Sequence, residues 1–204
     1  ASDINSLIKK LYETTFFSDI SVELKNNKLS IIVKEGRVAD ILYDGKAAKR
    51  GLAVAFPGVR GQIFQLRDLE QGIDYMNRLQ SHNVRISIKP GTHSGESIVV
   101  LNNKNGNPHH VSLRYDNYAQ KAMAVYPKSM DLSRDNLLGV NDHIRLGVSQ
   151  SNTEGGQNSH SISMSFSLPY GYWLLDVSVS QFEYTNFYTG GYGQYVYSGN
   201  SRTL

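Results

Sequence analysis

Strict alternation of side-chain type over residues 161–168 constrains this chain more than any other sequence feature. Four serines, at 161, 163, 165 and 167, alternate with Ile162, Met164, Phe166 and Leu168. Successive side chains of a β-strand point to opposite faces, so one face here carries hydroxyls and the other apolar groups. The same period recurs over residues 111–115, 144–148 and 173–180. The C-terminal half is therefore predicted to form antiparallel strands.

Charged residues divide the chain near Asn105. Residues 1–104 contain 15 Lys and Arg with 11 Asp and Glu, whereas residues 105–204 contain 6 and 7. Tyrosine shows the opposite trend, with 3 before Pro108 and 10 after it. We therefore expect two domains of different type. The formal charge is only +3, with acidic and basic residues interleaved, so no nucleic-acid partner is expected.

Residues 1–36 show a helical pattern followed by two strand patterns. The apolar residues of 4–11 fall on one helical stripe, with Ser2 or Asp3 available as the N-cap. Residues 20–24 and 29–33 then alternate around Asn26-Asn27, which is typical of a hairpin turn. The expected order is helix, strand, strand.

Residues 37–101 predict a second α/β arrangement. Residues 37–44 favour a strand, and residues 46–55 favour a short helix that ends at Phe56-Pro57-Gly58. In the next helix the apolar positions are Leu66, Leu69, Ile73 and Met76. Strands are predicted over 84–88 and 97–101, so the order is strand, helix, helix, strand, strand.

Three features favour a membrane-facing sheet over a soluble sandwich in the second half. Short turns at 137–142 and 169–171 alternate with long polar segments at 150–159 and 185–193, as in outer-membrane barrels. The inward positions are small or charged, which suits a wet lumen. Aromatic residues cluster at the expected strand ends, where interfacial girdles lie: Tyr170, Tyr172, Trp173, Tyr184, Phe187 and Tyr188.

The number of strands is too small for a closed barrel. We count five, with the start of a sixth near Tyr195, whereas the smallest barrels have about eight. An open edge in hydrocarbon leaves backbone groups unsatisfied. The chain also lacks an initiator Met. We therefore expect a processed or truncated piece of a longer protein.

Residues 64–79, Phe-Gln-Leu-Arg-Asp-Leu-Glu-Gln-Gly-Ile-Asp-Tyr-Met-Asn-Arg-Leu, resemble the second POTRA domain of the two-partner secretion transporters, the TpsB proteins. These include haemolysin activators and contact-dependent-inhibition exporters. The helix motif at its centre is Leu66, Arg67, Asp68, Leu69, Glu70 and Gln71. Further similar segments are 33–38, 55–57, 90–91, 95–97, 135–142 and 198–202. Gln65 and Tyr75 depart from the residues usual in the family, which are Asn and Gln.

The resemblance implies the fold and the organisation of the domains. Residues 1–36 would be the C-terminal part of a first POTRA domain, and residues 37–104 a complete second one with β-α-α-β-β order. Residues 105–204 would supply the first strands of an antiparallel transmembrane barrel of about sixteen strands. The POTRA domains would lie in the periplasm and the barrel in the bacterial outer membrane, in contact with its lipid.

The resemblance also implies a function. A monomeric pore would capture an unfolded secreted TpsA-type partner through its POTRA domains and export it. In such a sheet the strand after the second helix is an open edge to which an extended client can add. That strand is Val84, Arg85, Ile86, Ser87 and Ile88. Arg85 and Lys89 either steer an acidic client or protect the edge by their charge.

Other functions have weaker support in the residues. An outer-membrane protein assembly factor shares both parts, and a soluble β-sandwich adhesin or carbohydrate binder also alternates. The six histidines are scattered, and adjacent His109 and His110 would face opposite sides of a strand, so no metal site is expected. Turn chemistry explains the Asp and Asn residues of 135–142 without calcium. Neither catalytic residues nor a cofactor are predicted, and the protein is not expected to be an enzyme.

Overall fold

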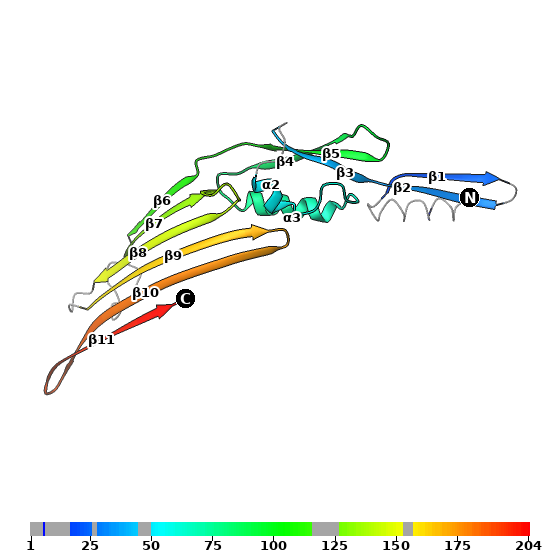
Figure 1. The fold of residues 1–204 in the computed structure, drawn as a ribbon. Coiled ribbons are helices and arrows are strands. Elements are labelled where there is room, and N and C mark those ends of the chain that lie inside the picture. The colour runs from blue at the N-terminus through cyan, green and yellow to red at the C-terminus, as the bar shows by residue number, and fades with distance from the viewer. Residues whose placement is uncertain (1–5, 7–16, 26–27, 45–49, 116–126, 153–156) are drawn as a thin grey trace. The chain divides into compact units, whose positions relative to one another are not determined.

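The computed structural model describes residue 6 and residues 17–25, 28–44, 50–115, 127–152 and 157–204 (Figure 1). The predicted helix over 4–11, the turn at 26–27 and the start of the predicted helix 46–55 lie outside these residues. The chain forms two compact units. The first comprises 1–106 with the short segments 139–141 and 169–173, and the second comprises 107–138, 142–168 and 174–204.

Within the described residues, the first unit contains strands and helices in the predicted order. β1 (Phe17–Lys25) and β2 (Lys28–Glu35) pair as an antiparallel hairpin. The module that follows confirms the order strand, helix, helix, strand, strand. Its elements are β3 (Arg37–Tyr43), α2 (Arg50–Ala55), α3 (Leu66–Asn77), β4 (Val84–Pro90) and β5 (Glu96–Asn103).

The module is built on a mixed three-stranded sheet with the order β3-β5-β4. β5 is central, parallel to β3 and antiparallel to β4. Apolar residues of the sheet and of both helices form one buried core. Its members include Val38, Val99 and Leu101 from the sheet, Leu52 and Ala55 from α2, and Leu69 and Met76 from α3.

The apolar stripe of α3 is buried over most of its predicted length. Leu69 and Met76 are buried and Ile73 is half-buried, as the spacing predicts. Leu66 differs, because it is 39% exposed. It occupies the first position of the helix, next to exposed Gln65, and this end of the apolar stripe lies outside the core. No helix in the described part of the chain is long and apolar enough to cross a membrane.

The second unit is a six-stranded sheet in which each strand neighbours the next along the chain. The strands β6 to β9 pair antiparallel with their neighbours, and so do β10 and β11, which confirms the sheet predicted from the alternation. β11 confirms the sixth strand expected near Tyr195. The strands are β6 (His109–Tyr115), β7 (Lys128–Asp135), β8 (His143–Asn152), β9 (Asn158–Tyr170), β10 (Trp173–Gly190) and β11 (Gly193–Thr203).

The register of β6 to β9 aligns side chains of one type into rows across the sheet. One apolar row is Val111, Leu132, Leu146 and Met164, and the next is Leu113, Met130, Val148 and Ile162. All eight side chains are exposed in this chain, at 37–75%. Because the side-chain period is two, the other face of the same strands carries the polar residues.

The polar face contains short side chains together with charged residues, which include Asp131 and Arg145. Arg145 donates from Nε and Nη2 to Asp131 Oδ1, at 3.0 and 2.8 Å. The hydroxyls of Ser149 and Ser161 are 2.7 Å apart. Gly147 lies between Asp131 and Ser163, where an added Cβ would be 2.9 Å from Asp131 Oδ1 and 2.8 Å from Ser163 Oγ. This face is therefore packed with polar groups that a larger residue at position 147 would disturb.

The predicted long polar loop over 185–193 is wrong. β10 extends to Gly190, and only Gly191 and Tyr192 separate it from β11. Thr185 pairs with Ser198 and Tyr188 with Tyr195, so this segment continues the ladder. Threonine and aromatic residues favour strands, which outweighs the polarity that suggested a loop. Tyr184, expected at a strand end, consequently lies inside β10. Within the segment 150–159, residues 150–152 end β8 and residues 158–159 begin β9, while 153–156 lie outside the described residues.

Gly72 provides a test of the packing of α3. An added Cβ at this buried position would lie 2.1 Å from Phe56 Cε1. Alanine normally stabilises a helix interior relative to glycine, but overpacking a core costs about 1–3 kcal/mol. We therefore expect Gly72→Ala to destabilise the module by about 1–3 kcal/mol, measured as faster hydrogen exchange at Val99 and Leu101. Asp74→Ala, exposed on the same helix, should leave exchange unchanged. Equal or slower exchange in Gly72→Ala would contradict the close packing.

Candidate functional site

The predicted binding strand is an edge of the three-stranded sheet. Residues 84–88 all lie in β4, which pairs with β5 on one side only. The predicted helix motif, residues 66–71, lies in the first half of α3. Leu69 of that motif and Val84 belong to the same core cluster, whereas the exposed side chains of the motif face elsewhere. The two predicted sets therefore share a core but do not form one continuous surface.

The side chain of Asn77 covers the start of the β4 edge. Asn77 Nδ2 donates to Val84 O at 3.1 Å, and Val84 N donates to Asn77 Oδ1 at 2.6 Å. The last residue of α3 thus forms the two hydrogen bonds that a neighbouring strand would form with Val84. The main-chain groups of Val84 must therefore point away from β5. Sequence reasoning missed this contact, because an Asn at a helix end is explained equally well by capping.

The orientation of Val84 determines which β4 groups face outward. In an antiparallel pair, the main-chain groups of alternate residues point to the same side. β4 and β5 pair without a register shift, so Ile86 and Ile88 face outward together with Val84. Pro90 has the same parity but has no N–H, which suits a proline at an edge. The open part of the edge is therefore Ile86 and Ile88.

The two faces of β4 differ in chemistry. Ile86 is half-buried against the core, and Ile88 is 49% exposed. Arg85, Ser87 and Lys89 are exposed on the opposite face. An added strand at this edge would meet an apolar side chain on one face and positive charge on the other.

The other edge of the sheet is covered by the loop before α3. Val38 N donates to Gln62 O at 3.0 Å, Gly61 N donates to Val38 O at 2.7 Å, and Phe64 N donates to Gly36 O at 2.7 Å. Arg37 also forms an isolated antiparallel bridge with Ile63. The start of β3 is thus paired, which leaves β4 as the more accessible edge.

The first unit also includes the turn 169–173, which contacts both helices. Gly171 N donates to Val54 O at 2.9 Å, and Tyr75 Oη donates to Tyr172 O at 3.1 Å. Gly171 has a φ of +56°, and an added Cβ would be 2.8 Å from Pro57 Cγ, so only glycine fits. Pro169 is fully buried.

Tyr172 carries the most specific contacts of this turn. Its hydroxyl donates to Asp68 Oδ1, and the guanidinium of Arg67 lies 5.9 Å from the centre of its ring. The hydrogen bond to Asp68 raises the pKa of the Tyr172 phenol, and partial burial raises it further. Two residues of the predicted helix motif therefore hold a turn more than ninety residues away in the sequence.

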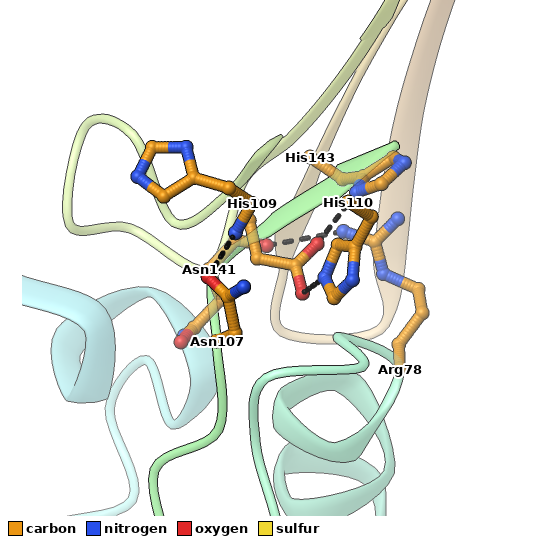
Figure 2. A network of polar contacts seen from close by, with 7 residues as sticks. Arg78, Asn107, His109, His110, Asn141 and His143 are labelled. Atoms are coloured by element: carbon orange, nitrogen blue, oxygen red, sulfur yellow. Dashed lines mark hydrogen bonds and ion pairs between the residues drawn. The ribbon is translucent and has the colours of Figure 1, made fainter. Parts of the chain in front are cut away.

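A second turn contacts the opposite ends of the same helices. Asn141 Nδ2 donates to Gly51 O at 2.8 Å. Arg78 Nη2 donates to Asn141 O at 3.0 Å (Figure 2). An added Cβ at Gly51 would approach Asn141 and Gly139 to 3.3 Å. Arg78 is therefore half-buried against the segment 139–141.

The second unit contains a buried carboxylate that the sequence does not predict. His143 Nδ1 lies 2.7 Å from Asp135 Oδ1, and His110 Nε2 lies 3.1 Å from Asp135 Oδ2 (Figure 2). Asp135 is 1% exposed. The three residues come from the ends of β6, β7 and β8, which the register brings together. Within the described residues, no group of His, Asp and Glu is arranged to hold a metal ion.

Turn chemistry accounts for the neighbouring acidic residue. Leu138 N donates to Asp142 Oδ1 at 2.9 Å, and Asn136 N donates to Asp142 O at 2.7 Å. Asn136 and Asn141 have positive φ values of 52° and 61°, which asparagine tolerates better than most residues. These bonds close the turn that links β7 and β8.

Comparison with known proteins places both parts of the chain. Residues 37–90 match the POTRA domain model, and residues 95–204 match the model of the haemolysin secretion/activation proteins ShlB/FhaC/HecB. The two matches together define the class as TpsB-type proteins. Because the second match covers more than half of the chain, the protein belongs to the haemolysin secretion/activation family ShlB/FhaC/HecB.

Individual relatives agree with the family. The chain is 35% identical over 165 residues to the outer membrane transporter CdiB of Dickeya dadantii, covering 80% of this chain and 29% of that protein. It is 29% identical to the hemolysin transporter protein HpmB of Proteus mirabilis, covering 90% and 34%. The solved structure of CdiB from Escherichia coli matches with a TM-score of 0.85 at 28% identity, covering 98% and 39%. The chain thus spans about a third of the length of these relatives.

The contact between Tyr172 and Asp68 predicts a shifted titration. Because the pKa of Tyr172 is raised in the folded state, its stabilising contribution is present at neutral pH and is lost as pH rises through that pKa. We expect Tyr172 to ionise above the usual value near 10, and Asp68→Asn to return it toward that value. The pKa of Tyr172 is measured by ultraviolet titration of tyrosinate, as the difference between the curve of the wild type and that of Tyr172→Phe. Tyr75→Phe is the control, and identical titrations of wild type and Asp68→Asn would exclude the contact.

Proposed function

We propose that this chain is part of an outer-membrane pore that exports a secreted partner protein. The observation that carries the proposal is the open β4 edge at Ile86 and Ile88 in a POTRA module joined to an antiparallel sheet. Relatives named outer membrane transporter and hemolysin transporter support it. The pore would work as a monomer without a cofactor, and residues 105–204 would be its first barrel strands.

The proposed capture step is strand addition at β4. An extended client would exchange main-chain hydrogen bonds with Ile86 and Ile88, which requires no particular client sequence. This suits a transporter whose cargo passes unfolded. Residues 37–104 would form the complete POTRA domain that performs this step, and residues 1–36 would be the end of a preceding one.

The positive charges beside the β4 edge would make this capture step favour acidic client segments. Arg85 and Lys89 are exposed on one face of β4, and neither forms an ion pair with the described residues. Their attraction acts over about 10 Å at ordinary salt, so it favours the approach of an acidic client segment. The same charges discourage pairing with the edge of another copy of this basic strand.

The exposed apolar rows of the second unit support placement in a membrane. A soluble sandwich would have to cover Leu113, Met130 and Ile162 with a second sheet, whereas lipid covers them directly. The polar face with Arg145, Asp131 and the serines would then line the lumen, along which an extended chain can pass. The POTRA modules would lie on the periplasmic side.

Ile88→Pro tests strand addition at β4. The N–H of Ile88 points away from β5, so proline removes an outward donor while leaving the β4–β5 ladder intact. We expect roughly tenfold weaker binding of the unfolded secreted partner, equivalent to about 1.4 kcal/mol, measured with the whole protein in detergent. Secretion of that partner by cells should fall in parallel.

Two controls separate binding from folding in this test. Ile88→Ala removes the side chain but keeps the N–H, so it should retain most of the binding. Ser87→Pro removes a donor that faces β5, so it should loosen the sheet itself. Wild-type binding and secretion by a folded Ile88→Pro variant would rule out the β4 edge as the capture site.

A further inference from the structure

Acidic side chains are confined to one face of β6 to β9. On the face with the apolar rows, the charged or ionisable side chains are Lys128, Arg134, His109 and His160, as the register shows. The two carboxylates of these strands, Asp131 and Asp135, lie on the other face. The apolar face of these four strands therefore carries basic groups without any acidic residue of its own.

A groove of about 790 Å³ lies on this face. Its floor includes the apolar row Leu113, Met130, Val148 and Ile162. Lys128 lines one end, in the next row of the register. The groove thus joins a long apolar surface to a cation.

Lys128 is placed to bind an anion. Its Nζ lies 5.8 Å from the centre of the Tyr115 ring, which holds the side chain over the sheet. It forms no ion pair with the described carboxylates. Gln150 is its cross-strand neighbour and supplies a further donor. Glu183 on β10, an acidic residue near this end of the face, has its carboxylate 3.0 Å from His160 Nε2 and forms no described ion pair with Lys128.

The other end of the face repeats the arrangement. A smaller groove of about 330 Å³ is lined by Val111, Leu132, Leu146 and the basic residue Arg134. Arg134 lies six positions from Lys128 on β7, about 20 Å along the strand. Long basic side chains extend further toward the membrane surface. Each end of the apolar face therefore combines a groove with one basic residue.

We propose that the larger groove binds a lipid that carries a phosphate group, with acyl chains on the Leu113 row and the phosphate on Lys128. This rests on the proposed placement of the sheet in a membrane. Charge complementarity selects the occupant, because an uncharged lipid leaves Lys128 unpaired and a soluble anion leaves the apolar row exposed to water. A protein partner would need its own acidic residue at the end of an apolar strip.

Native mass spectrometry of the whole protein in detergent tests this site. The probes are phosphatidic acid and diacylglycerol with the same acyl chains, which differ only in the phosphate. We expect wild type to retain phosphatidic acid in preference to diacylglycerol, and Lys128→Gln to lose about tenfold of that preference. Lys128→Arg should keep it, and Lys104→Gln, a change at an exposed lysine outside the sheet, should resemble wild type.

Three outcomes would overturn the site. Equal retention of the two lipids would show that the phosphate is not recognised, and an unchanged preference in Lys128→Gln would exclude this lysine. Displacement of phosphatidic acid by millimolar inorganic phosphate would indicate a site for free anions. Flotation with vesicles separates this proposal from the export function. A protein that does not float would contradict membrane placement, whereas one that floats without lipid preference would contradict only the lipid site.

Discussion

The three-stranded sheet depends on how the main-chain hydrogen-bonding groups of its two edge strands find partners. Edge residues present N–H and C=O groups that need water, another part of the chain or another chain as a partner. The β3 edge is paired with the loop at 61–64, and Val84 is paired with Asn77. Pro90 has no donor to offer. The open stretch is therefore bounded on both sides and limits how much of another chain can pair with this sheet.

Local periodicity predicted most of the fold, whereas contacts between distant residues were not predictable. The serine alternation over 161–168 predicts β9 and its two faces, because the period of a strand is a local property. The same reasoning predicted too short a strand for β10, because Thr185 and its neighbours are polar enough to suggest a loop. The β4 edge was predicted from a resemblance, but its restriction to Ile86 and Ile88 depends on Asn77, seven residues away. The spacing of apolar and polar residues gives no information about a side-chain contact of this kind.

Several contacts depend on backbone paths that bring distant residues together. Tyr172 and Asp68 are separated by 104 positions, and Asn141 and Gly51 by 90. The first contact joins two side chains and the second uses the main-chain oxygen of Gly51, so the helix motif of 66–71 cannot specify either contact alone. The Asp135 carboxylate likewise gains its two histidines only through the register of β6 to β8. At the sequence level, turn chemistry alone explains Asp135 and Asn141, and the scattered histidines give no indication of a shared partner.

A short open edge gives weak pairing, and weak pairing suits a role in export. Ile86 and Ile88 together offer at most two N–H and two C=O groups, each hydrogen bond being worth about 0.5–1.5 kcal/mol net. Fixing the backbone of an extended client costs about 1–2 kcal/mol per residue, which offsets much of that gain. A client segment would therefore be held briefly and released without an input of energy. If the Asn77 contact and Pro90 were absent, the longer edge would retain the cargo and favour pairing between copies of the sheet.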